Sequence, residues 1–442
     1  MKVFDGFVNF VNRLGLGASN SFDGVRYVKR YLTEQREQLE AMYRENWLVG
    51  AIIDAIADDS TRAGVDFKGE LLPADEALLQ KHLTRNNFWK ILNNGLKLSR
   101  LYGGAILFLE IEGQDSSLPL DIKSVTRGAI KNLRVYDRWQ LQASSEIVFD
   151  GQNGMPESFR VLEGFGQGQV LHHSRCVRLN GASLPFVDAK QYDFFGASVL
   201  EKLESRLVYF DEATAGAAQL VGKAHLRTVS IDGLREILAA GGQAENNLLR
   251  MFEQMRYLQS NEGITLLDKN DSFSTHSYGF GGLDSMLIHL GQQLSGACGI
   301  PLVRLFGQSP AGLNSTGEND LRNYYDTINA LQESILREPL TFLFDCYFRD
   351  VFGVEPPVDF DFDFNVLWQE KKADKIAAGV AAAGIVLQAY EKGVLSQKSA
   401  LLELKKQGFD NGLFTQISDE DVESAGFELP PEIDGELDGG EL

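Results

Sequence analysis

The feature that most constrains this chain is an excursion in its middle, where two helix-forming stretches enclose a small mixed unit. The first stretch, Ala197–Ala224, contains no proline and repeats its apolar residues with the period of a helix. The second is Leu283–Cys298. Since strands and helices resume on both sides, we expect a body built from two distant parts of the chain. The enclosed unit is predicted to hold the strands Leu226–Ser230, Ile264–Leu267 and Ser272–Ser277 and the helices Ile231–Ala240 and Glu245–Gln259.

The part of the body before the excursion is predicted to be α+β. Amphipathic helical spacing runs over residues 24–63, and further helices are expected from Pro73 onward and over Trp89–Tyr102. The glycine-bounded apolar run Gly103–Gly113 is typical of a strand. Turn residues separate the strand-like pieces that follow, which favours a mostly antiparallel sheet. These pieces are Ile130–Tyr136, Ile147–Phe149, Ser158–Leu162 and Cys176–Leu179.

The part after the excursion begins with a long helix, Asp320–Phe352, that we expect to be broken or bent near Pro339. The segment Pro356–Trp368 then alternates as a half-buried strand does, and its acidic face is interpreted as solvated, with an ion site or a subunit contact as alternatives. Two helices follow, Glu370–Lys392 and Ser396–Lys406. The strand faces carry Phe360, Phe362 and Phe364 on one side and Asp359, Asp361 and Asp363 on the other.

Charge is distributed unevenly along the chain, whose formal net charge is −20. Residues 410–442 contain eleven Asp and Glu and no Lys or Arg, so only −9 of the −20 belongs to the residues before them. Affinity for DNA comes largely from cations that displace counterions from phosphates, so a tight DNA binder is not expected. The acidic end is predicted to be a disordered, solvating tail, or a segment that docks on a basic partner.

Cysteine usage and hydropathy point to a cytosolic, soluble protein without membrane contact. The three cysteines, Cys176, Cys298 and Cys346, are scattered and odd in number, which suits a reducing compartment. The first residues lack the pattern of a secretory signal. No stretch reaches the ~18 apolar residues that a membrane span needs.

Two adjoining segments resemble those of phage portal proteins. One is LFGQSPAGLNSTGENDLRNYYDTI (Leu305–Ile328), which joins a loop rich in small and polar residues to a helix. The other is the preceding stretch Ile264–Gly307, in which a strand leads into a helix and then into Gly-Ile-Pro. The resemblance covers residues 24–407. It implies an α+β portal fold with a mixed α/β wing, two stem helices, a small α/β clip, a tunnel loop, a long helix and a helical crown.

The resemblance also implies where these parts begin and end. In chain order they are a flexible arm (1–22), the first part of the wing (23–195), the first stem helix (196–223), the clip (224–280), the second stem helix (281–304), the tunnel loop (305–320), the long helix with the wing strand (321–368), the crown (369–409) and the acidic tail (410–442).

A member of this family is expected to be a structural protein with no catalytic residue, cofactor or metal. The resemblance implies a ring of twelve subunits at one capsid vertex that conducts double-stranded DNA during packaging and ejection. Its expected partners are the large terminase, docked around Arg235–Arg256 of the clip, the major capsid and scaffolding proteins, and a head–tail adaptor. The acidic tail would repel packaged DNA or dock on scaffolding protein. The expected location is the virion, after assembly in the host cytoplasm.

A conduit for DNA should hold the duplex without binding it tightly, since a ring multiplies each phosphate contact by its copy number. The tunnel loop fits this requirement because Leu305–Asp320 contains no Lys or Arg. Near the clip, Lys223 and Arg227 are candidates for contact with the DNA backbone, and capping of the helix C-terminus is the equal alternative. The loop residues predicted to line the channel are Gln308, Ser309, Gly312, Asn314, Ser315 and Gly317.

The strongest alternative is an enzyme that resembles two-histidine phosphoesterases and acts on nucleotides. Such enzymes place two His-x-Thr/Ser elements across a cleft, with one histidine as base and the other as acid. His82-Leu83-Thr84 and His172-His173-Ser174 fit, although so short a pattern arises easily by chance and His82 falls in a predicted helix. Gly164–Gln169 lacks the Lys-Ser/Thr of a phosphate loop and is expected to be a hairpin turn. The cluster of His172, His173 and Cys176 lacks a second ligand pair for a metal.

Overall fold

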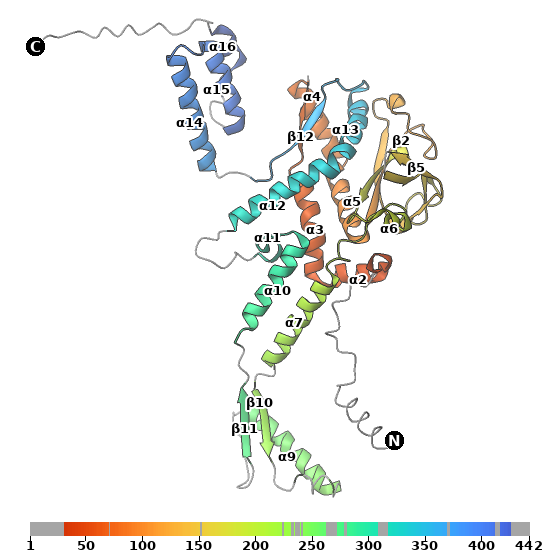
Figure 1. Ribbon diagram of the computed structural model, residues 1–442, viewed down its shortest axis with the longest axis vertical. Helices are drawn as coiled ribbons and strands as arrows, with labels where there is room; N and C mark the ends of the chain where they lie inside the picture. Colours follow the sequence, from red (N-terminus) through yellow and green to blue (C-terminus); the bar gives the residue numbers. More distant parts are fainter. Residues whose placement is uncertain are drawn as a thin grey trace, which may run out of the picture. The chain divides into compact units, whose positions relative to one another are not determined.

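The computed structural model describes residues 31–69, 71–150, 153–222, 225–230, 234, 239, 242–261, 272–277, 281–307, 317–368, 372–411 and 416–425. The chain, drawn in Figure 1, divides into two units, Met1–Asn365 and Val366–Leu442. The predicted arm at residues 1–22 and the predicted strand Ile264–Leu267 lie outside the described residues, as does nearly all of the predicted helix Ile231–Ala240.

Helices open the first unit, as the amphipathic spacing predicts. The side chain of Asn46 begins one of them by accepting hydrogen bonds from the backbone N–H groups of Leu48 and Val49. Another ends at Gly103, whose φ of 87° suits glycine. The elements are the 3₁₀ turn η1 (Leu32–Glu34) and the helices α2 (Arg36–Glu45), α3 (Trp47–Thr61), α4 (Pro73–Arg85) and α5 (Phe88–Tyr102).

Strand β2 (Gly104–Ile111) separates two apolar cores, because successive side chains of a strand point to opposite faces. Leu107 and Leu109 enter the larger core together with α5. Ile106 and Phe108 enter a smaller core on the other face. The strand is therefore buried along nearly its whole length, as its continuous apolar run predicts.

The remaining strands before the excursion form several small antiparallel sheets instead of the single sheet that we expected. β2 lies between β3 (Ile130–Asp137) and β9 (Cys176–Asn180) in one sheet. Turns after every few residues keep the others short, so they pair only locally. They are the sheet β4 (Leu141–Ala143), β7 (Ser158–Val161) and β8 (Val170–His172), and the hairpin β5 (Ile147–Asp150) and β6 (Asn153–Pro156). Gly164–Gln169 joins β7 to β8, which confirms the predicted hairpin turn.

A two-stranded sheet joins the early part of the first unit to its end. β1 (Val65–Lys68) pairs with β12 (Asp361–Phe364), so that Phe67 lies opposite Phe362 and Lys68 opposite Asp361. The phenylalanines of β12 are buried and its aspartates are exposed, as the alternation predicts. The expectation that distant parts of the chain form one body is therefore confirmed.

The long helix is irregular before its proline. It consists of α12 (Glu318–Leu331), a π-helical turn η5 (Gln332–Leu336) and α13 (Arg337–Phe352). Pro339 has no N–H to offer the carbonyl of Ile335, four residues earlier, and its ring crowds that carbonyl. The expected break near Pro339 therefore takes the form of a wider turn over residues 332–336.

The excursion contains α7 (Glu204–Gly222), β10 (His225–Ser230), α9 (Gly242–Asn261), β11 (Ser272–Ser277) and α10 (Leu283–Cys298). Strands β10 and β11 pair antiparallel. The first helix was predicted to begin at Ala197, which is wrong, because it begins at Glu204. Ala197 instead forms a backbone bridge with Ala182, and Leu200 and Leu203 are buried in the body. The short helices α6 (Phe186–Gln191) and α11 (Leu302–Phe306) lie before and after the excursion.

The second unit is a helix pair with a short third helix. α14 (Lys372–Glu391) packs on α15 (Gln397–Asn411), which confirms the two helices predicted there. The prediction of a disordered acidic tail is wrong for residues 416–425, because α16 (Asp419–Ser424) forms within them. Ser418 and Asp421 cap each other's backbone at its start, and Val422 is buried.

Candidate functional site: the α7–α10 helix pair

Helices α7 and α10 lie side by side and bury only a narrow stripe between them (Figure 1). Leu207 and Leu294 are buried. Five other large apolar side chains of the pair remain 40% to 48% exposed. Helices that are apolar on several sides are normally covered by further protein. The exposed set is Val208, Tyr209, Leu220, Met286 and Ile288.

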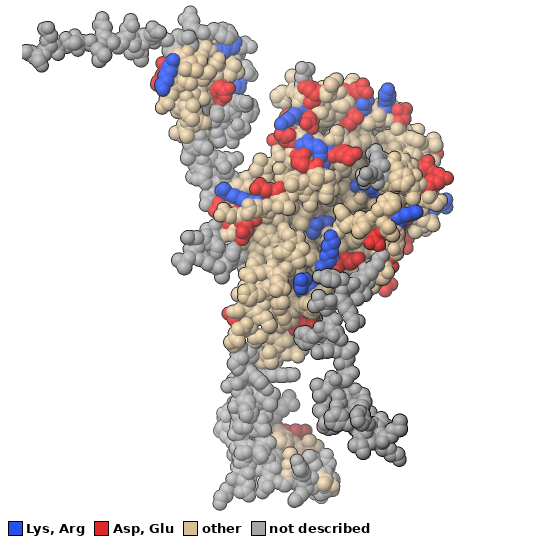
Figure 2. All heavy atoms as spheres, in the orientation of Figure 1, with Lys and Arg blue, Asp and Glu red and all other residues tan. Residues whose placement is uncertain are grey.

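The pair is also poor in charge. Asp284 is the only Asp, Glu, Lys or Arg within α10, and α7 has none after Glu212. Figure 2 shows the visible face of this region mostly free of charged side chains, whereas acidic and basic groups gather on the part of the body above it. The exposed apolar side chains of the pair therefore lie on a surface with few charged groups.

Aromatic and polar contacts hold the base of the pair on the body. The ring of Phe306 in α11 lies 5.8 Å from the Trp47 ring of α3 and 5.7 Å from the Phe210 ring of α7. Asn46 donates a 2.7 Å hydrogen bond to Asp211 of α7. Burial raises the pKa of Asp211, and this bond opposes the shift. The base of α7 is thus joined to both α3 and α11.

The turn after α10 is built from Gly-Ile-Pro. Gly299 ends the helix in the left-handed conformation, with φ 70°, and Ser295 donates a 2.6 Å hydrogen bond to the carbonyl of Ile300. Pro301 then precedes α11. A cavity of about 430 Å³ lies beside this turn, lined by residues of α10 and α12 that include Gln292 and Tyr324.

Most predicted channel residues fall outside the described part of the chain. Gln308, Ser309, Gly312, Asn314 and Ser315 are not described. Gly317 is, and it precedes α12 with a φ of 69°. Gly307, which ends α11, has a φ of 68°. Left-handed glycines therefore stand at the end of α11 and before α12. The predicted bounds of the tunnel loop, 305–320, are too wide, because α11 continues to Phe306 and α12 begins at Glu318.

The residues predicted near the clip are described only in part. Lys223 lies outside the described residues, and Arg227 lies in β10, where its backbone is opposite Thr275. Helix α9 covers the second half of the predicted terminase-docking stretch Arg235–Arg256 and exposes Leu249, Met251 and Phe252.

The two histidines of the enzyme alternative have different surroundings. His82 of α4 lies 2.8 Å from the buried carboxylate of Asp350 in α13. The Nδ1 of His172 lies 2.9 Å from Ser174 of its own tripeptide, and burial lowers the pKa of His172. Leu83 belongs to the larger core and Leu171 to the smaller one. Each histidine thus has a hydrogen-bond partner within the folded body.

A second cavity, of about 410 Å³, lies beside His173 and is lined from β9 and α13, with neither His82 nor His172 among its lining residues. Within the part of the chain that the structure describes, no cluster of three or more His, Cys, Asp or Glu could hold a metal ion. Over the same residues, no helix is long and apolar enough to cross a bilayer.

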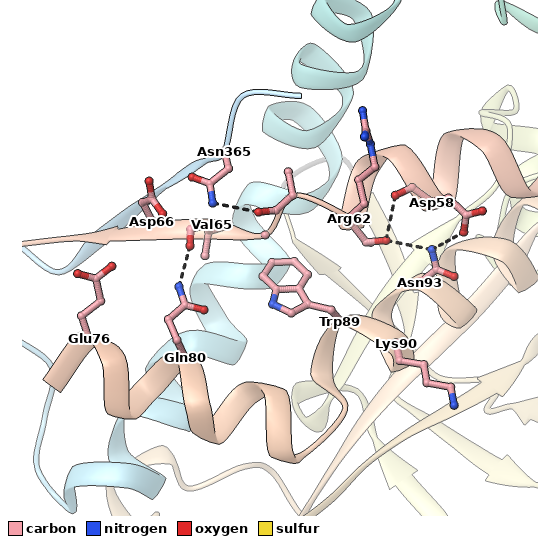
Figure 3. A pocket seen from close by; sticks show the side chains of 13 residues that line it. Asp58, Arg62, Val65, Asp66, Glu76, Gln80, Trp89, Lys90, Asn93 and Asn365 are labelled. Carbon is pink, nitrogen blue, oxygen red and sulfur yellow. Dashed lines mark hydrogen bonds between the residues drawn. The ribbon is translucent and has the colours of Figure 1, made fainter. Parts of the chain in front are cut away.

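A further cavity, of about 760 Å³, belongs to the frame of the body (Figure 3). Asn365 donates to the carbonyl of Ala63, and Gln80 donates to that of Val65. Asn93 donates to both Asp58 and Thr61. These bonds join α3, α4, α5 and the residue after β12, so the polar groups in this cavity hold the elements together.

One candidate residue carries no signal in the local sequence. Asp59 of α3 is buried, with its side chain 3% exposed, and it lies between α11 and α12. It accepts from Arg304 Nε at 2.9 Å and from the Tyr324 hydroxyl at 2.9 Å. No local pattern marks this aspartate, because its partners lie 245 and 265 residues away.

Comparison with known proteins gives a family for the chain's sequence. The family described as phage portal protein matches residues 37–384. A Haemophilus influenzae protein described as uncharacterized is 28% identical over 431 residues, which cover 96% of this chain and 94% of that protein. A Sphingomonas paeninsulae protein named anti-CBASS protein Acb1 is 30% identical over 396 residues. The chain spans only 62% of that protein's length.

The fold has a solved counterpart in the neck of an empty GTA particle, computed with C6 symmetry. That structure and this one share a TM-score of 0.52 and 13% sequence identity, over 83% of this chain and 93% of that one. At this level of identity the likeness concerns the fold.

Proposed function

The chain belongs to the phage portal protein family, and on that premise we propose that it forms a closed ring at one capsid vertex through which DNA is packaged and ejected. The observation that carries this proposal is the α7–α10 pair, which leaves five large apolar side chains uncovered in one subunit. Neighbouring copies would cover them. A ring uses one repeated head-to-tail contact, so no subunit keeps an open face.

The charge of the pair supports its role in a channel for DNA. A duplex that moves through a ring meets every wall contact as many times as there are subunits, so cations on the wall would hold it back. Helix α10 offers no Lys or Arg, and α7 offers only Arg206, near its base. We propose α7 and α10 as the two stem helices, with a copy number of twelve.

The clip and the tunnel loop complete the proposal. The strands β10 and β11 with α9 would form the clip, and the exposed apolar residues of α9 suit the docking of a terminase or a head–tail adaptor. The residues between α11 and α12 would form the loop. Deletion of Ser309–Ser315, or Gly312→Pro, is expected to impair packaging or retention of DNA, measured as DNA per capsid. Wild-type packaging by the deletion variant would contradict the loop assignment.

The test of the ring is negative-stain microscopy together with native mass spectrometry of the purified full chain. Hollow rings with a central channel are expected, with a mass that gives the copy number. A folded monomer at every concentration measured would overturn the proposal.

The enzyme alternative is kept because the Sphingomonas relative is named as an anti-CBASS protein and not as a portal protein. The contacts of His82 with Asp350 and of His172 with Ser174 count against it, because they give both histidines a structural role. His172→Ala is expected to leave ring formation and DNA packaging unchanged. A loss of packaging with rings intact would revive a chemical role for this histidine. His82→Ala is a poorer test, because it removes a partner from the buried Asp350.

A further inference from the structure

A single buried carboxylate joins the two helices that flank residues 308–316. Asp59 Oδ2 accepts hydrogen bonds from Arg304 Nε of α11 and from the Tyr324 hydroxyl of α12, both at 2.9 Å. Asp59 Oδ1 lies 3.1 Å from Arg62 Nε of its own helix. Both long-range bonds end on the same oxygen atom, so α11 and α12 have a common point of attachment on α3.

We propose that Asp59 is a positioning residue that fixes the spacing between α11 and α12 and thereby the place of Gly307 and Gly317 beside the end of α10. This inference rests on the proposed channel, in which α10, α11 and α12 would lie next to the DNA. It adds a specific anchor in the body for this junction.

The chemistry of the cluster suits a rigid anchor. An isolated charge in a buried site is costly, whereas a carboxylate with charged and neutral donors is held in one orientation. Burial lowers the pKa of Arg304, but its bond with Asp59 prevails and raises it. Burial and Asp59 together raise the pKa of Tyr324, so this phenol stays protonated and donates.

The anchor transmits to α10 because little chain separates them. Only the residues Gly299, Ile300 and Pro301 lie between α10 and α11, and Ile300 is buried. Further along the same chain, Gln332 donates a 2.8 Å hydrogen bond to the carbonyl of Ser60, the residue after Asp59. The stretch from α12 into η5 is therefore held on one turn of α3 at two points.

Asp59→Asn removes the charge and keeps the shape of the side chain. The matched control is Asp58→Asn on the same helix, because Asp58 is 45% exposed and forms its ion pair, at 2.9 Å, with Lys97 of α5. Tyr324→Phe removes one of the donors and keeps the ring. Asp59→Glu restores the charge on a longer side chain.

Hydrogen exchange on assembled rings reads the anchor directly. We expect Asp59→Asn and Tyr324→Phe to assemble rings in which the amides of Leu302–Phe306 and the first turns of α12 exchange about tenfold faster or more, while those of α13 and β2 are unchanged. DNA retained per capsid should fall in step, with partial recovery in Asp59→Glu. Asp58→Asn should match the wild type in both measurements.

Two results would overturn the inference. One is exchange and DNA retention in Asp59→Asn that equal those of Asp58→Asn. The other is faster exchange spread evenly over the whole body, which would make Asp59 a general stability residue. If Asp59→Asn fails to fold, Tyr324→Phe decides the question by the same criteria. The absence of rings from the wild-type chain would instead refute the proposed function, which separates the two failures.

Discussion

At the scale of single residues, three glycines allow the backbone of the body to close where the excursion begins. Gly103 ends α5, Gly181 follows β9, and Gly196 precedes the bridge between Ala182 and Ala197. A Cβ on Gly181 would come within 2.3 Å of the Ala197 carbonyl oxygen and 2.7 Å of the Gly103 Cα. These are backbone atoms, which cannot move aside by changing a side-chain rotamer.

Gly181→Ala is therefore expected to lower the free energy of unfolding by about 1–3 kcal/mol, as overpacking does. The matched control is Gly50→Ala in α3, where a Cβ would meet nothing closer than 4.0 Å. It should be neutral or stabilising by up to about 1 kcal/mol, since alanine favours a helix. Chemical denaturation of both variants checks this, and equal stability would show that the body relaxes around Gly181.

Buried thiols give a second prediction at this scale. Burial raises the pKa of Cys346 to about 12, from the 9.0 of a free thiol, and raises that of Cys176 further. Neutral thiols react slowly, so neither cysteine should react with Ellman's reagent at pH 8 until the protein unfolds. Only Cys298, which is half-buried, is expected to react in the folded chain.

The same shift predicts a pH dependence. A pKa that is higher in the folded state means that the unfolded chain loses its proton first as the pH rises. The contribution of Cys346 to stability is therefore complete below about pH 9 and is lost progressively toward pH 12. Cys346→Ala should flatten that part of the stability curve, and an unchanged slope would assign the effect to other groups such as Tyr102, whose pKa burial also raises to about 12.

At the scale of elements, β12 holds the two ends of the body together. Phe362 is buried, and its ring lies 4.9 Å from that of Phe344 in α13 and 5.4 Å from that of Phe364. Phe362→Ala is expected to cost about 3–5 kcal/mol, because it leaves a cavity between β1 and α13. Asp363→Ala removes an exposed ion pair with Lys68 and should cost less than about 1 kcal/mol. Urea titration of both variants would reveal equal costs if β12 were not part of the core.

Elements whose pattern is local were predictable from the sequence. The alternation of phenylalanine and aspartate in β12 and the apolar run of β2 each determine their burial within a few residues. The start of α7 was not predictable, because residues 197–203 have helical spacing but are drawn into the body by tertiary contacts. Glu201, for example, accepts from both the backbone and the hydroxyl of Thr33, 168 residues away. The role of Asp59 was not predictable for the same reason, since both of its partners are remote in sequence.

At the scale of the whole molecule, the exposed apolar side chains of α10 predict where rings break. Met286→Asp and Ile288→Asp introduce charge into a surface that would be covered by a neighbouring copy, so rings should dissociate while the single subunit stays folded. Leu118→Asp is the control, because Leu118 is an exposed apolar residue outside the helix pair. Sedimentation velocity separates rings from subunits. Rings that persist in both α10 variants would move the subunit contact away from this face.

The excursion leaves and re-enters the body at neighbouring points, since Phe210 near the start of α7 touches Phe306 just after α10. Among the residues between these points that the structure describes, none belongs to the larger core, which the strands β1 and β12 and the helix α13 complete from outside the excursion. The excursion is thus an insertion into a body whose larger core is formed by other parts of the chain. On the proposed function, the segment between α7 and α10 should be exchangeable for that of another portal protein, which would change the docking specificity and leave the body unchanged.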